Sequence, residues 1–199
     1  MAKLLRKSKT ESVLNKSDFS IAGRNFRSPF YPILTAVTWM LLMVGSASAA
    51  LRTWTGAGGN DNWSTAANWG GIVPGIGDDI AFGGSTRLTP NNDLAANTSF
   101  NSIAFNGGAG NFVIGGNSIN VAGGASSIVS SVSSGSETIS LAITFTGSAT
   151  ISSAAGGQLI LSGSVSNGNF AMTVSSSGNT DITGVLSGTG SLTKSGGGI

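Results

Sequence analysis

The 199-residue sequence contains no cysteine and no histidine, and only 9% of its residues are charged. Without cysteine there is no disulfide framework, so stability has to come from backbone pairing and an apolar core. The same two absences exclude cysteine nucleophiles, imidazole-activated nucleophiles and the usual zinc sites. Residues 50–199 also lack any window in which apolar residues recur at helical spacing, which argues against an α-helical fold.

Positive charge is concentrated at the N-terminus, and the rest of the chain is acidic. After residue 49 only Arg52, Arg87 and Lys194 remain, against six acidic residues, which gives that part a net charge of −3. A nucleic-acid-binding protein needs a basic face, and residues 50–199 cannot form one. Nucleic acid is therefore excluded as a partner.

Residues 1–49 have the pattern of a secretory signal peptide. A long basic segment precedes the uncharged apolar run Ile33–Val44, which we expect to be helical, and Ala47 and Ala49 supply the small residues of a cleavage site. We predict cleavage after Ala49. A retained signal anchor is the alternative, although the apolar run is shorter than the roughly 20 residues that span a bilayer.

The remaining residues form short segments in which apolar and small polar residues alternate. Alternation at period two predicts strands with one buried face, and Gly, Ser or Asn at their ends predicts tight turns. The clearest case is the run Ile139, Leu141, Ile143 and Phe145; others are Ile103 with Phe105, Ile119 with Val121, Leu159 with Leu161, and Phe170 with Met172 and Val174.

These segments recur at a spacing of about twenty residues, which predicts a solenoid. Gly163–Ser166 is echoed by Gly184–Ser187, and the pair Ile139 and Leu141 matches Leu159 and Leu161 twenty residues later. We predict an all-β protein, a right-handed parallel β-helix over residues 85–199. An antiparallel β-sandwich is the alternative, because short strands permit it too.

Residues 50–84 differ from the repeating part and contain Trp54, Trp63 and Trp69. We interpret this segment as an N-terminal cap, because a solenoid end needs cover over its open sheet edges and large aromatic side chains bury the most area. The alternative is a carbohydrate-binding surface, since flat aromatic rings stack well on sugars.

Two segments resemble the autotransporter-associated β-strand repeat proteins of Gram-negative bacteria. Residues 53–84 contain the short motifs Trp-Thr-Gly, Trp-Ser and Asn-Trp, and they resemble the stretch that follows the signal peptide in that family. Residues 184–199 resemble the beginning of its repeat, through the glycine motif formed by Gly188, Gly190, Leu192, Lys194 and Gly196. The resemblance implies a secreted or surface-displayed β-helical passenger without enzyme activity. No complete repeat and no translocator barrel follow, which suggests a fragment of a longer chain.

Other site chemistry has little support in the sequence. Gly56–Asp61 partly matches a calcium-binding nonapeptide but occurs once, so no metal site is expected. Asp78 and Asp79 are the only adjacent acidic pair, and the pair is expected to cap a turn after Gly75–Gly77. We therefore expect an exported, non-enzymatic structural or adhesin-like protein without a cofactor, whose partners are the outer-membrane export machinery and extracellular polysaccharide or other surface material. A polysaccharide lyase or hydrolase is the remaining alternative.

Overall fold

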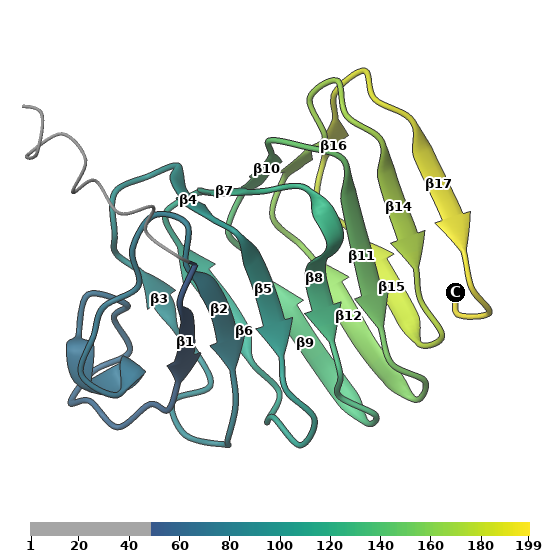
Figure 1. The fold of residues 1–199 in the computed structure, drawn as a ribbon. Helices are drawn as coiled ribbons and strands as arrows, with labels where there is room; N and C mark the ends of the chain where they lie inside the picture. The colour runs from purple at the N-terminus through teal and green to yellow at the C-terminus, as the bar shows by residue number, and fades with distance from the viewer. Residues whose placement is uncertain (1–48) are drawn as a thin grey trace, which may run out of the picture. The chain divides into compact units, whose positions relative to one another are not determined.

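The computed structural model describes residues 49–199, and nearly all of the regular structure in this part is β-strand (Figure 1). The signal peptide predicted for residues 1–49, including Ala47, lies outside the described residues except for Ala49. The described part includes one helical segment, the short 3-10 helix η1 (Ala66–Trp69), and no helix in it is long and apolar enough to cross a membrane.

The strands form three sheets that the chain visits in turn. Sheet A has seven strands: β1 (Leu51–Trp54), β2 (Asp79–Phe82), β5 (Ser102–Phe105), β8 (Gly124–Ser130), β11 (Ala149–Ser153), β14 (Met172–Ser175) and β17 (Leu192–Ser195). Sheet B has five: β3 (Asn91–Asn92), β6 (Val113–Gly116), β9 (Gly135–Ile139), β12 (Gly157–Leu161) and β15 (Asn179–Ile182). Sheet C also has five: β4 (Thr98–Phe100), β7 (Ile119–Val121), β10 (Ile143–Phe145), β13 (Val165–Ser166) and β16 (Leu186–Ser187).

Each turn runs through one strand of sheet A, one of sheet B and one of sheet C before the chain returns to sheet A. The five turns are β2–β4, β5–β7, β8–β10, β11–β13 and β14–β16, with β1 before the first and β17 after the last. Within the described residues every strand pair is parallel. The predicted parallel β-solenoid is confirmed, and the antiparallel sandwich is wrong.

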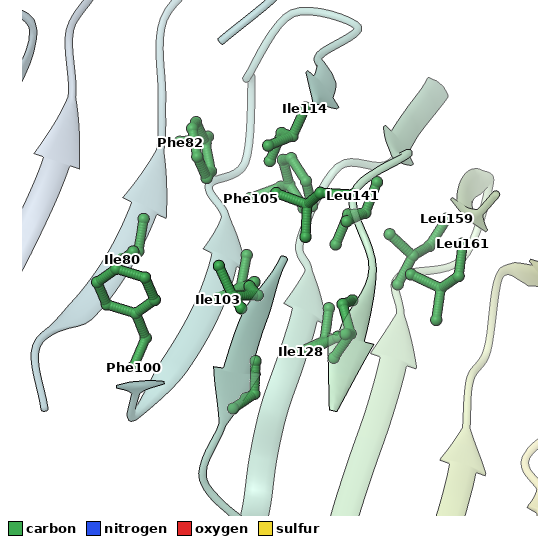
Figure 2. Packing of buried hydrophobic residues seen from close by; sticks show 14 of the residues in the cluster. Ile80, Phe82, Phe100, Ile103, Phe105, Ile114, Ile128, Leu141, Leu159 and Leu161 are labelled. Atoms are coloured by element: carbon green, nitrogen blue, oxygen red, sulfur yellow. The ribbon is translucent and has the colours of Figure 1, made fainter. Parts of the chain in front are cut away.

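The core is a set of apolar columns that run along the solenoid. Because parallel partners share a face, each inward side chain packs on its equivalent in the next turn. One column in sheet A consists of Ile80, Ile103, Ile128, Ile151 and Val174, all buried. Figure 2 shows part of this packing, including the stacked rings of Phe82 and Phe105, whose centroids are 5.5 Å apart.

The buried run Ile139 to Phe145 is confirmed, but it is not one strand. Its four apolar residues are at most 2% exposed. However, β9 ends at Ile139 and β10 begins at Ile143, with a corner between them that passes from sheet B to sheet C. Alternation continues around the corner because Leu141 also points inward, so the sequence pattern did not mark the bend.

The repeat spacing was right at one place and wrong at another. Val165 and Ser166 pair with Leu186 and Ser187, as the predicted offset of 21 residues requires. Ile139, however, pairs with Leu161 and not with Leu159. A two-residue slip leaves every side chain on its original face, so alternation alone cannot distinguish these two registers.

A charge placed inside the solenoid should be far more damaging than one outside it. Leu141→Asp should unfold the protein at a much lower denaturant concentration, because an unpaired carboxylate would replace a buried apolar contact. Thr144→Asp is the matched control: Thr144 is exposed on the outer face of β10, and its substitution should change the free energy of unfolding by about 0.5 kcal/mol or less. Equal loss of the β-signal in far-UV circular dichroism for both variants would contradict the assignment of faces.

Candidate functional site

The three tryptophans of residues 50–84 form one buried cluster at the N-terminal end of the solenoid. Trp54 is the last residue of β1, Trp69 the last of η1, and Trp63 lies between these two elements. The Trp69 ring is close to both others, with centroid distances of 5.1 Å to Trp54 and 5.5 Å to Trp63, each edge to face. All three also pack against Phe82 of the first turn. This geometry is favourable for aromatic pairs, and it covers the interior columns at this end.

Hydrogen bonds fix the loop that carries the tryptophans. The buried side chain of Asn68 accepts a hydrogen bond from the Gly58 amide (2.8 Å) and donates to the carbonyl oxygens of Asn60 (2.9 Å) and Asn62 (3.0 Å). The Trp69 indole donates to the Trp63 carbonyl at 2.8 Å. The loop is therefore a packed structural element of the solenoid end.

The buried rings leave no platform for a sugar. Trp54 and Trp63 are 0% exposed and Trp69 is 5% exposed. Stacking on a pyranose requires a ring face open to solvent, and none of these three offers one. The capping role predicted for residues 50–84 matches this arrangement, although the segment is not separate from the solenoid, because β1 and β2 are the first two strands of sheet A.

Two ion pairs involve the cap, one within it and one between the cap and the first solenoid turn. Arg52 contacts Asp78 (2.9 Å), and Arg87 contacts Asp61 (2.8 Å). The hydrogen bond from Arg87 is the main reason that the pKa of Asp61 lies below its usual value. Partial burial raises the pKa of Asp78, but hydrogen bonds from the Gly75 amide, Arg52 and the Ala50 amide outweigh this effect and lower it overall.

The carboxylate oxygens of Asp61 and Asp78 are already engaged in hydrogen bonds within the protein. Of the pair expected to cap the turn after Gly75–Gly77, Asp78 does so, with its Oδ2 accepting from the Gly75 amide at 2.9 Å, whereas Asp79 accepts from Asn101 and Ser102. Both carboxylate oxygens of Asp61 are already bonded, to Arg87 and Thr89. Within residues 49–199 no three acidic side chains gather into a metal-binding group.

A shallow hollow of about 300 Å³ lies beside the irregular start of β8. It is lined by Asp79, Asn101 and Ser102 and by residues 123–127. The register between β8 and β11 shifts here, so the start of β8 leaves the regular ladder. Asp79 is the one ionisable side chain in the lining, so the hollow lacks the carboxylate pair that glycoside hydrolysis uses.

The glycine motif of residues 188–196 follows the last complete turn and includes β17, at the C-terminal end. Gly188 follows β16, Gly190 precedes β17, and Leu192 and Lys194 belong to β17. A Cβ on Gly190 would lie 1.7 Å from the Phe170 carbonyl oxygen, so only glycine allows this close stacking on the turn before. Gly196, at φ 78°, occupies the left-handed region that favours glycine.

Glu137 is the buried ionisable residue that our sequence analysis missed. It is 0% exposed and lies on the inward face of β9. Burial raises its pKa to about 7, and the hydrogen bond from the Phe112 amide opposes this shift only in part. Extending the alternation of Ile139 and Leu141 back by two residues would have placed Glu137 inside, and this was the available signal.

Comparisons with protein-family models, with curated proteins and with solved structures give no match for this chain. The structure therefore assigns the protein to a class by architecture alone, as a parallel β-solenoid with an aromatic N-terminal cap.

The cap makes a direct prediction for Trp63. Trp63→Ala should lower the free energy of unfolding by about 3–5 kcal/mol, because it opens a cavity among the rings and exposes the first turn. Trp63→Phe should cost less, since the Trp63 indole N–H is buried without a partner among the described residues. Urea unfolding followed by tryptophan fluorescence measures both changes.

Ile76→Ala is the control for this experiment, because Ile76 belongs to the same segment but is 80% exposed. Its substitution should change stability by about 0.5 kcal/mol or less. If Trp63→Ala were as mild as Ile76→Ala, the tryptophan cluster would not be a cap.

Proposed function

We propose that this protein is an exported, non-enzymatic β-helical passenger that serves as a structural or adhesin-like element at the bacterial cell surface. The observation that supports this most is the difference between the two ends of the solenoid. One end is closed by the tryptophan cap, whereas the last turn presents apolar side chains to solvent.

The exposed apolar side chains of β16 and β17 continue the buried columns. Leu192 pairs with Met172, which is fully buried, yet Leu192 itself is 53% exposed. Leu186 pairs with the buried Val165 and is 39% exposed. These positions have the geometry of inward residues with no turn stacked on them, so the last turn is suited to receive another coil. A further β-helical coil is the occupant that we propose.

The composition of the outer faces is consistent with a surface role. The outward column of sheet C contains Ser99, Asn120, Thr144, Ser166 and Ser187, all small or polar. Such a surface presents hydroxyl and amide groups without concentrated charge, as is suitable for contact with extracellular polysaccharide or other cell-surface material. This partner class, like the export machinery of the outer membrane, is part of the proposal.

Export can be tested on the full chain produced in a Gram-negative host. We expect the exported protein to begin at Ala50, as measured by N-terminal sequencing or intact mass. Replacing both small residues of the cleavage site, Ala47→Lys and Ala49→Lys, should prevent processing, because signal peptidase requires small side chains there. Full-length protein held in the inner membrane would favour a signal anchor, and full-length protein in the cytoplasm would contradict export.

The exported material also separates the proposed function from its alternatives. Incubation with a panel of polysaccharides should release no new reducing ends and no unsaturated products. Release of either product would identify a hydrolase or a lyase. Retention on a polysaccharide column that is unaffected by Trp63→Phe would place any binding surface outside the tryptophan cluster.

A further inference from the structure

Glu137 lies in an apolar position between two successive turns of the solenoid. Its strand β9 pairs with β12 on one side, where Glu137 is the register partner of the buried Leu159. On the other side its neighbour is Phe112, which immediately precedes β6 and is also fully buried. A carboxyl group therefore occupies a place in a column that is otherwise apolar.

One oxygen of this carboxyl group joins the two turns. Oε2 accepts a hydrogen bond from the Phe112 backbone amide at 2.8 Å. The bond lies where the ladder between β6 and β9 is short, because only Val113 with Thr138 and Ile114 with Ile139 are paired there. The side chain thus extends the connection between the second and third turns beyond the end of the strand pairing.

The other oxygen, Oε1, is buried and has no hydrogen-bond partner among the described residues. No ionisable side chain faces the carboxyl group from the surrounding strands. The two strands that pair with β9, β6 and β12, contain no ionisable residue. The other strands nearby, β7, β8, β10 and β11, contain none either. The nearest acidic residue along sheet B, Asp181 of β15, is bonded to Gln158 on the outer face. A negative charge on Glu137 would therefore be buried with a single amide donor and no counter-charge, which is strongly unfavourable.

We propose that Glu137 is a proton-controlled latch between the second and third turns of the solenoid: its neutral carboxyl group is accommodated between β6 and β9, and ionisation loosens these strands. A carboxylate would accept more strongly from the Phe112 amide, but a buried charge without a counter-charge costs more than this one bond returns. The latch rests on geometry that is independent of the proposed surface function: a fully buried carboxyl group, one bond across the turns and one oxygen without a partner.

The direction of the pH dependence follows from the two states. In the unfolded chain Glu137 has its ordinary pKa of 4.5, and in the folded protein burial raises the pKa to about 7. The stabilising effect is complete below pH 4.5 and is lost as the pH rises through 7. Three other acidic groups, Asp61, Asp78 and Asp93, have lowered pKa values, and they change stability in the opposite direction, as the pH falls below about 4.

The experiment measures urea unfolding of the full chain between pH 5 and pH 9, together with amide hydrogen exchange at Phe112. We expect the unfolding equilibrium constant to rise by more than about tenfold between pH 5 and pH 7 and to level off above pH 8. Protection of the Phe112 amide, corrected for intrinsic exchange rates, should fall over the same range before global unfolding occurs.

Glu137→Gln is the decisive variant, because it keeps the size of the side chain and an acceptor for the Phe112 amide but cannot ionise. Its stability should be independent of pH over this range. Asp181→Asn is the matched control, a neutralised outer-face carboxylate in the same sheet, and it should retain the pH dependence of the parent. Glu137→Leu provides a second non-ionising variant if Glu137→Gln fails to fold. A parent protein without this pH dependence, or a non-ionising variant that keeps it, would overturn the proposal.

Discussion

The fold depends on the stacking of each turn on the one before it through parallel strand pairing. Inward side chains gain their burial from the turns on either side, so no single turn is stable alone. The column from Ile80 to Val174 is an example, because each of its side chains is covered by the equivalent side chain of the next turn. The same constraint makes the two ends special, because the first and last turns each lack one neighbour. At the N-terminus the chain supplies Trp54, Trp63 and Trp69 in place of the missing turn.

Period-two alternation was sufficient to predict strands, buried faces and the class of fold, because it follows directly from the geometry of a pleated strand. It could not fix the register: Ile139 meets Leu161 and not Leu159, and both pairings place apolar residues on the inner face. It also could not locate the corner after Ile139, because Leu141 remains inward there. Glu137 was missed because the alternation was recognised by its apolar residues, and a charged residue at an inward position was therefore not counted as part of it.

The structure changes the relative weight of the functional hypotheses. Crowded tryptophans predicted either a cap or a sugar platform, and these differ only in exposure, which a sequence cannot supply. Buried rings with edge-to-face contacts support the cap. The most unusual chemical group is then Glu137, where a carboxyl group joins two turns from inside the core. At the other end, Leu192 extends a buried column into solvent, and this difference between the two ends underlies the proposal of a β-helical passenger.

Register between turns can be measured most directly by disulfide trapping, which the absence of cysteine makes unambiguous. Thr138 and Ile160 are partners on the outer face of β9 and β12, whereas the twenty-residue spacing of the sequence pattern would pair Thr138 with Gln158. Partner positions on adjacent strands are about 4.8 Å apart, within the range that a disulfide bridges. The double variant Thr138→Cys with Ile160→Cys should therefore oxidise rapidly and completely, as followed by thiol titration and mobility on non-reducing gels. Preferential oxidation of Thr138→Cys with Gln158→Cys would contradict the register in which the turns stack.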